Sequence, residues 1–361
     1  MQTIKAAVCR EFGAPLVIED ILLAPPGMGQ VEVALDAVAI CHSDISYAEG
    51  AWGGHLPAVY GHEAAGIITD IGAGAGKFQI GDSVVVTLIR ACGSCPNCAG
   101  GKPTLCETGY DGTKGPISTA EGEALEQAMA CGAFAEKVVV DHSQIVKIPE
   151  TMSKEAASLL SCGVITGVGA AVNAAGLRAG QDVVVIGAGG VGLNAIQGAR
   201  IAGARRIVAV DMTEEKLEIA RDFGATHGVL ASEKSPWRAS YKALGGRGAD
   251  VVLITVGAIP AYEQAPKYLG RGGRAIIIGM PHSGAMASYE PVMLAAVGQG
   301  MIGSKMGDVV IQRDIPWMID LYQQGRLKLD ELISGRWRLD QINEAIADTK
   351  TGSAKRNVIV F

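Results

Sequence analysis

The chain has 361 residues, of which 48% are hydrophobic and 19% charged, and its formal net charge is −6. This much apolar material excludes an intrinsically disordered protein, and the length predicts two domains or three. Because acidic residues outnumber basic ones and no long basic block occurs, the composition argues against a nucleic-acid-binding protein.

Two segments bear on a membrane location. The first ten residues lack the order of basic, apolar and small residues found in a secretory signal peptide. Residues 156–177 carry no charge and are long enough to span a bilayer, but they include four glycines and four polar residues. That composition favours a buried helical segment, so we expect a soluble cytoplasmic protein without a membrane partner.

Residues 1–150 contain short runs of alternating or β-branched residues separated by Gly, Pro and Asp turns. Strands are predicted to begin at Gln30, Gly66, Ser83 and Glu136. This pattern is typical of an all-β, barrel-like region. A helix-like run from Ser153 marks the end of this region.

Residues 165–290 alternate between strand and helix patterns, which predicts right-handed crossovers and a doubly wound parallel sheet. After about residue 305 we expect one more helix and a final strand. The predicted strands are 182–186, 206–210, 250–255, 274–278 and 357–361, and the predicted helices are 191–202, 214–223 and 317–324.

A glycine-rich G-x-G-x-x-G motif lies between the first strand and the first helix of this alternating region. In that context the motif predicts a tight turn followed by a helix, with the N-terminus of the helix facing the pyrophosphate of a dinucleotide. Asp211 ends the next strand, where a carboxylate accepts hydrogen bonds from ribose hydroxyls and repels a 2′-phosphate, which favours NAD over NADP. Residues 72–76 are also glycine-rich but lead into another strand, so we expect a loop. The motif residues are Gly187, Gly189, Gly190, Val191 and Gly192.

Four of the eight cysteines lie within 15 residues, at Cys92, Cys95, Cys98 and Cys106. Four thiolates leave no open coordination position, which suits a structural zinc. An iron–sulfur cluster is the alternative, because C-x-x-C-x-x-C also holds such clusters.

A second set of candidate ligands is dispersed along the chain. Cys41 and His62 lie on either side of a loop, and Cys162 lies at the junction of the two regions. Two cysteines and one histidine leave one tetrahedral position open, as in a catalytic zinc site. Cys9 and Cys131 have no assigned role, and we expect them to be small buried residues.

Together, the Cys-His-Ser-Asp, Gly-His-Glu, four-cysteine and glycine motifs resemble the zinc-dependent medium-chain alcohol dehydrogenase family over essentially the whole chain. The resemblance implies an α/β fold: a GroES-like catalytic domain in residues 1–162, a Rossmann domain in 163–300, and a return to the catalytic domain in 301–361. It also implies NAD, two zinc ions per chain, and hydride transfer between NAD and a primary or secondary alcohol, such as a medium-chain or aromatic one.

The resemblance also implies roles at the catalytic zinc. Asp44 would orient the ligating histidine, and Glu63 would approach the metal during ligand exchange or serve as a structural ion-pair partner. Ser43 would take the alcohol proton. Many family members end this proton relay in a histidine where this chain has Ser46. The implied zinc ligands are Cys41, His62 and Cys162.

Further positions follow from the same resemblance. His42 and Arg356 match positions near the pyrophosphate, and Lys216 matches one near the adenosine ribose. Besides Ser43, the substrate pocket would be lined by Trp52, Leu88 and Phe134. We expect a homodimer or a homotetramer.

Two alternatives remain open from the sequence. One is another zinc dehydrogenase of this fold, such as a polyol dehydrogenase or a formaldehyde dehydrogenase or dismutase. The other is a non-catalytic, crystallin-like nucleotide-binding protein, although such relatives generally lack the zinc ligands that this chain retains.

Overall fold

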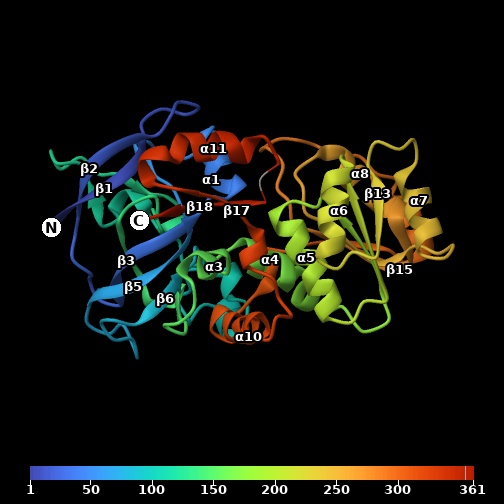
Figure 1. The fold of residues 1–361 in the computed structure, drawn as a ribbon, viewed down its shortest axis with the longest axis horizontal. Coiled ribbons are helices and arrows are strands. Elements are labelled where there is room, and N and C mark those ends of the chain that lie inside the picture. Colours follow the sequence, from blue (N-terminus) through green and yellow to red (C-terminus); the bar gives the residue numbers. More distant parts are fainter. Residues whose placement is uncertain (354) are drawn as a thin grey trace. The chain divides into compact units, whose positions relative to one another are not determined.

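The computed structural model describes residues 1–353 and 355–361 and divides the chain into two compact units (Figure 1). The first unit holds residues 1–162, 310–325 and 329–361, and the second holds 163–309 and 326–328. The chain thus returns to the first unit at Val310, later than the expected residue 301. The reason is that strand β16 (Gly300–Gly303) still pairs with its neighbour β15 in the second unit.

The first unit is built on two sheets. One has the strand order β7-β2-β1-β4-β8, and the other has the order β10-β6-β5-β3-β18-β17, with β9 also paired to β3. The four predicted strands of this region correspond to β3, β5, β6 and β9. The strands are β1 (Gln2–Cys9), β2 (Val17–Leu23), β3 (Gln30–Ala39), β4 (Ala58–Val59), β5 (Glu63–Ile71), β6 (Ser83–Val86), β7 (Ile117–Ser118), β8 (Glu126–Gln127), β9 (Lys137–Asp141), β10 (Ile145–Lys147), β17 (Ile333–Trp337) and β18 (Arg356–Val360).

Strand β3 is the centre of the second of these sheets. It pairs antiparallel with β5, with β9 and with β18, so its backbone is bonded along both edges. Val31 and Val33 are completely buried in the core of the unit. The last strand of the chain therefore completes a sheet that the first 150 residues began.

The helices of the first unit are short, except near the C-terminus. The predicted helix 317–324 begins earlier, at Ile311, because the carboxylate of Asp314 accepts the Val310 amide at 2.9 Å and satisfies the start of the helix. The α-helices are α1 (His42–Ala48), α2 (Pro96–Ala99), α3 (Lys154–Leu159), α10 (Ile311–Gln323) and α11 (Ile342–Lys350).

The second unit is a six-stranded parallel sheet with the order β13-β12-β11-β14-β15-β16, which confirms the doubly wound prediction. Strand β13, at one end of the sheet, had not been predicted. Its strands are β11 (Asp182–Ile186), β12 (Arg206–Asp211), β13 (His227–Leu230), β14 (Ala249–Ile254), β15 (Leu269–Ile277) and β16, and its helices are α4 (Gly163–Gly169), α5 (Gly190–Ile201), α6 (Glu214–Asp222), α7 (Pro236–Ala243), α8 (Ile259–Tyr268) and α9 (Pro291–Val297).

The uncharged stretch 156–177 does not form one continuous helix. It is divided among α3, α4 and a π-helical turn at Ala170–Ala174, and most of its residues are buried. Within the described residues, no helix combines the length and the apolar character that a membrane span requires.

Gly192 allows α5 to begin directly against the strand that precedes it. A Cβ at Gly192 would lie 1.9 Å from the carbonyl oxygen of Gly187 and 2.9 Å from Oγ1 of Thr255. Alanine normally favours a helix interior over glycine, but here the contact with rigid backbone decides the outcome.

We therefore expect Gly192→Ala to destabilise the protein by about 1–3 kcal/mol and to lower the melting temperature. Thermal unfolding followed by circular dichroism measures the effect. The matched control is Gly300→Ala in β16, where nothing lies within 4 Å of the added Cβ. Equal melting temperatures for the two variants would contradict this account.

Candidate functional site

Four buried side chains of the first unit bring potential metal ligands together. One ligand atom from each of Cys41, His62, Glu63 and Cys162 lies within 4.8 Å of all the others. Cys41 caps the N-terminus of α1, while His62 and Glu63 lie at the start of β5. The structure thus brings together the three predicted ligands of the catalytic zinc and adds a carboxylate beside them.

The carboxylate of Asp44 connects the segments that carry these ligands. It is 1% exposed, and it accepts the backbone amides of Cys41 at 3.0 Å and Gly61 at 2.9 Å. The same carboxylate lies 2.9 Å from Nδ1 of His62. Asp44 therefore fixes the His62 ring and the backbone on both sides of the site, a larger role than the sequence suggested.

Gly61 is a positioning residue that was noted in the sequence only as part of the Gly-His-Glu motif. Its φ is +92°, and a Cβ there would lie 2.6 Å from the backbone nitrogen of Phe134. Only glycine fits this position, which aims the following imidazole at the cysteines.

His62 provides the test of whether a metal fits. An ionised Asp44 only accepts hydrogen bonds, so Nδ1 of His62 carries a proton, and in the neutral imidazole Nε2 keeps its lone pair. That Nε2 atom is buried and has no hydrogen-bond partner among the residues that the structure describes. A buried imidazole nitrogen next to two thiols, with its other nitrogen held by a carboxylate, is the donor set of a zinc site.

The electrostatics of the cluster favour a cation. A hydrogen bond with the Cys162 thiol is the largest cause that lowers the pKa of Cys41 well below its usual value. Burial raises the pKa of Glu63 to about 7 despite the nearby guanidinium of Arg356. A dication together with that guanidinium would balance the charges of two thiolates and one carboxylate.

Arg356, on β18, forms a buried ion pair with Glu63. One carboxylate oxygen of Glu63 accepts this hydrogen bond, whereas the other, Oε1, is buried without a partner in the described structure. The geometry thus contains the ion pair that was one of the two roles considered for Glu63. The match of Arg356 to a position near the pyrophosphate stays a prediction; in the structure its guanidinium pairs with Glu63.

The predicted pocket residues differ in exposure. The Ser43 hydroxyl oxygen lies 3.6 Å from the Cys41 sulfur, and Trp52 contacts the Tyr47 ring edge-on, with centroids 5.0 Å apart. Leu88 is half-buried against the core. Phe134 is 1% exposed and packs against Gly61, so it fills the core rather than presenting a free face.

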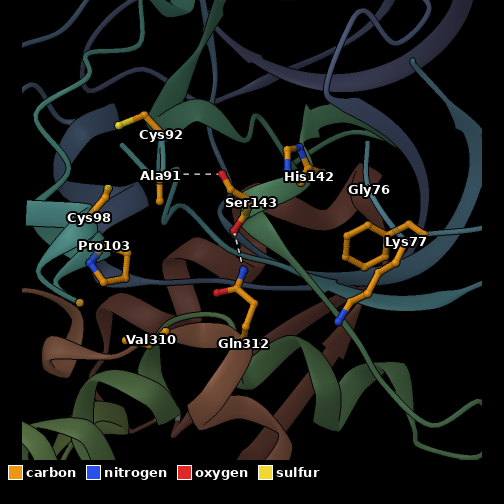
Figure 2. Close-up of a pocket in the computed structure, with 13 residues that line it drawn as sticks. Gly76, Lys77, Ala91, Cys92, Cys98, Pro103, His142, Ser143, Val310 and Gln312 are labelled. Atoms are coloured by element: carbon orange, nitrogen blue, oxygen red, sulfur yellow. Dashed lines mark hydrogen bonds between the residues drawn. The ribbon is translucent and has the colours of Figure 1, made fainter. Parts of the chain in front are cut away.

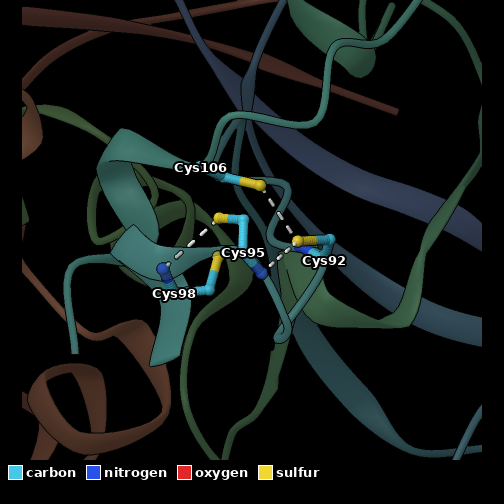
Figure 3. Close-up of side chains that lie close together, drawn as sticks. All are labelled: Cys92, Cys95, Cys98 and Cys106. Atoms are coloured by element: carbon cyan, nitrogen blue, oxygen red, sulfur yellow. Dashed lines mark hydrogen bonds between the residues drawn. The ribbon is translucent and has the colours of Figure 1, made fainter. Parts of the chain in front are cut away.

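The four clustered cysteines converge at a second site (Figure 3). Their sulfur atoms all lie within 4.8 Å of one another, close to the distance of about 3.8 Å expected around a tetrahedral zinc. Backbone amides of Cys92, Cys95 and Cys98 donate to neighbouring sulfurs at 3.3–3.4 Å. A hydrogen bond from the Thr108 side chain, followed by hydrogen bonds from the backbone amides of Cys95 and Ser94, lowers the pKa of Cys92 to about 5. The loop is therefore preorganised for a cation.

A cavity of about 440 Å³ lies beside this cysteine loop (Figure 2). Cys92 and Cys98 are on one side of it and Lys77 is on the other, and the Gln312 amide donates to the Ser143 carbonyl at 3.1 Å. None of the four residues at the Cys41 cluster lines this cavity. It is therefore separate from the site where the sequence places the alcohol.

The glycine motif has the geometry predicted for dinucleotide binding. Gly187 has a φ of +97° and makes the turn after β11, and Gly189 precedes the first residue of α5. A Cβ at Gly189 would have nothing within 4 Å. A side chain at this position would not clash with the protein, so packing does not explain the glycine. Its missing side chain leaves room for a ligand at the helix N-terminus.

Asp211 lies at the end of β12, and backbone hydrogen bonds fix the position of its carboxylate. Its carboxylate accepts the amides of Ala188 at 2.6 Å and Met212 at 2.7 Å, and the Lys216 ammonium is 3.9 Å away. Because a carboxylate has about four acceptor positions, it can still accept from a ribose. His42, the first residue of α1, is exposed.

Comparisons with known proteins agree with this geometry. Residues 27–150 match the alcohol dehydrogenase GroES-like domain, and residues 190–324 match the zinc-binding dehydrogenase domain. The NDMA-dependent alcohol dehydrogenase of Amycolatopsis methanolica is 35% identical over 365 residues, which cover 99% of this chain and 98% of that protein. The chain belongs to the zinc-dependent medium-chain alcohol dehydrogenase family.

Other relatives span the chain equally well. Alcohol dehydrogenase B of Mycobacterium tuberculosis is 34% identical and covers 99% of this chain and 98% of its own. The crystal structure of benzyl alcohol dehydrogenase from Acinetobacter calcoaceticus superposes with a TM-score of 0.93, at 30% identity and with complete coverage of both chains. As a member of this family the protein is an oxidoreductase that uses zinc and a nicotinamide cofactor.

We expect Asp44→Asn to weaken zinc binding at the Cys41 cluster about 10- to 100-fold, because an amide cannot hold His62 as a carboxylate does. Competition with a chromogenic chelator measures the affinity. Asp340→Asn, at an exposed carboxylate paired with Arg338, is the control. An unchanged zinc affinity in Asp44→Asn would contradict the positioning role.

The cysteine loop has little apolar support, since Thr104 is the one residue of its two short helices that is buried. We therefore expect Cys95→Ser to lose one zinc per chain and to make residues 92–106 sensitive to proteolysis, because folding there depends on the metal. Cys9→Ser, at a buried cysteine outside the loop, should retain the zinc content. Elemental analysis and limited proteolysis report both results.

Proposed function

We propose that this protein is an NAD-dependent alcohol dehydrogenase with a catalytic zinc at Cys41, His62 and Cys162 and a structural zinc at the cysteine loop. The observation that carries this proposal is the orphaned Nε2 of His62, buried beside two thiols while Asp44 holds the other ring nitrogen. A non-catalytic nucleotide-binding protein would have no need for that arrangement.

Several residues of this chain would each have a separate role in the reaction. When bound, zinc would polarise the alcohol oxygen, and the nicotinamide would accept the hydride. Asp44 keeps the proton on Nδ1 of His62. The Ser43 hydroxyl would accept the alcohol proton at Oγ while it gives up its own hydroxyl proton. Arg356 holds Glu63 so that its free oxygen stays next to the ligand cluster. Because Ser46 stands where many relatives have a basic relay residue, the proton released by Ser43 would leave through the ribose of a bound cofactor and water.

Our assignment of a substrate class rests on the relatives and on two half-buried apolar residues that the family resemblance places in the pocket. Benzyl alcohol dehydrogenase shares the whole fold, and Trp52 and Leu88 would provide an apolar wall. We therefore assign aromatic or medium-chain alcohols as substrates. The assay is reduction of NAD⁺ and NADP⁺ with ethanol, hexanol, benzyl alcohol and sorbitol, using protein of measured zinc content; activity with sorbitol alone would indicate a polyol dehydrogenase.

Asp211 should decide the choice of cofactor. We expect wild-type kcat/KM to be higher with NAD⁺, and Asp211→Gly to shift the NADP⁺/NAD⁺ ratio at least tenfold toward NADP⁺, because the change removes repulsion of a 2′-phosphate. Asp222→Gly, an acidic residue at the end of α6, is the control. A preference for NADP⁺ in the wild type would overturn this assignment.

The name of one relative supports a second reaction mode. An NDMA-dependent dehydrogenase is 35% identical over nearly the whole chain. In this mode the nicotinamide remains bound and an added acceptor reoxidises it. Alcohol turnover with NDMA but without added NAD⁺, together with co-purified nucleotide, would favour this mode over exchange of free NAD.

A homodimer through the β16 edge of the second unit fits the exposed apolar residues there. β16 is the terminal strand of its sheet, and α9 beside it has no buried residue. Val292 on α9 is 66% exposed, and Met286 before it is 83% exposed. An apolar surface of this kind next to a free strand edge is typical of a subunit interface.

We expect Val292→Glu to shift the protein from dimer toward monomer in light scattering, because it would bury a charge in that interface. Ile80→Glu is the matched control, since Ile80 is also 66% exposed but lies in the first unit. If both variants keep the wild-type mass, another surface forms the oligomer or the protein is monomeric.

A further inference from the structure

The sheet of the second unit ends in two edges of different character. The β16 edge is flanked by apolar residues. At the opposite end, β13 pairs with β12 and with no other strand of the described chain. One edge of its backbone is therefore available for hydrogen bonds, a feature that proteins usually cover or protect.

A groove runs beside that edge. It has a volume of about 520 Å³ and is lined by residues of β13 together with α6 before it and α7 after it. Both helices pack on β13 and lie on either side of it in Figure 1. The groove residues are Arg221, Thr226, His227, Gly228, Val229, Glu233, Ala239, Lys242 and Ala243.

The groove is cationic. Arg221 and Lys242 are exposed on its two walls, and neither forms an ion pair with another described residue. Glu233 is the one acidic residue in the lining. His227, which is held at Nδ1 by the Thr226 hydroxyl oxygen at 2.8 Å, adds an imidazole on the strand itself.

Gly228 allows Arg221 to reach the strand. A Cβ at Gly228 would lie 3.1 Å from a terminal guanidinium nitrogen of Arg221, so a side chain there would push that group away. The guanidinium thus lies over the middle of β13, close to the backbone that the groove leaves accessible.

We propose that this groove binds an extended acidic segment of a partner protein, which adds a strand to β13. Main-chain hydrogen bonds to the free edge would supply affinity, as in other cases of strand addition, and carboxylates of the segment would meet Arg221 and Lys242. Charge complementarity selects this occupant over a second copy of the sheet edge, because two copies would bring their cationic groups together.

The groove is distinct from the catalytic machinery. Neither the glycine motif nor Asp211 lines it, and cofactors of such sheets bind beyond the carboxyl ends of the strands rather than along an edge. Binding there would place the dehydrogenase next to a partner without blocking its reaction.

The direct test uses fluorescein-labelled peptides and anisotropy. The probe is Gly-Glu-Val-Glu-Val-Glu-Val-Gly, and two controls are the same peptide with lysine for glutamate and the same peptide with N-methylated valines. We expect the acidic peptide to bind, to weaken at least tenfold between 50 and 500 mM NaCl, and to bind better than either control. Absence of binding at 1 mM peptide, or equal binding of all three peptides, would overturn the proposal.

The location is tested with variants of the full-length protein. We expect Arg221→Gln with Lys242→Gln to weaken the acidic peptide at least tenfold while alcohol oxidation stays unchanged. Lys234→Gln is the matched control, because Lys234 is exposed in the β13–α7 connection but does not line the groove. In the wild type, the bound peptide should slow amide hydrogen exchange in residues 226–230. Binding that leaves this exchange unchanged, or that survives the double substitution, would place the peptide elsewhere and refute the proposal.

Discussion

The site depends above all on the buried carboxylate of Asp44. A carboxylate that is 1% exposed is costly unless donors surround it, and here two backbone amides and one imidazole do so. Those donors belong to Cys41, Gly61 and His62, so satisfying one charge also fixes the N-terminus of α1 against the start of β5. The ligand positions are therefore set by the same interactions that stabilise the first unit, and a metal finds them preorganised.

A second buried carboxylate, that of Glu63, connects the site to the C-terminal strand of the chain. Glu63 follows His62 directly, and its partner Arg356 begins the last strand of the chain. Because β18 pairs with β3, the sheet holds the guanidinium in the core. Removing either partner alone would leave an uncompensated charge beside the thiolates, whereas the pair together with a dication leaves the cluster neutral. Arg356, close to the C-terminus, thus contributes to the electrostatic environment of the ligand residues Cys41, His62 and Cys162.

The two units differ in charge in a way that suits their roles. The second unit has 16 Lys and Arg residues against 11 Asp and Glu, whereas the first has 15 against 26. A net positive unit attracts an anionic dinucleotide to the helix N-terminus after Gly189. The same excess of basic residues distinguishes the β13 edge from the apolar β16 edge, so the two edges of one sheet differ in character.

The parts of the protein whose chemistry is local could be predicted from the residues alone. The spacing of Cys92 to Cys106, the glycine motif and the strand–helix alternation depend on a few neighbouring residues, and the fold and family are confirmed. Which distant side chains contact one another became known from the folded structure. Strand pairing buries Phe134 in the core, engages Arg356 with Glu63 and leaves β13 at an open edge. These outcomes could not be derived from the order of residues alone, because they depend on which strands become neighbours in the sheets; Arg356 and Glu63, for example, are 293 residues apart.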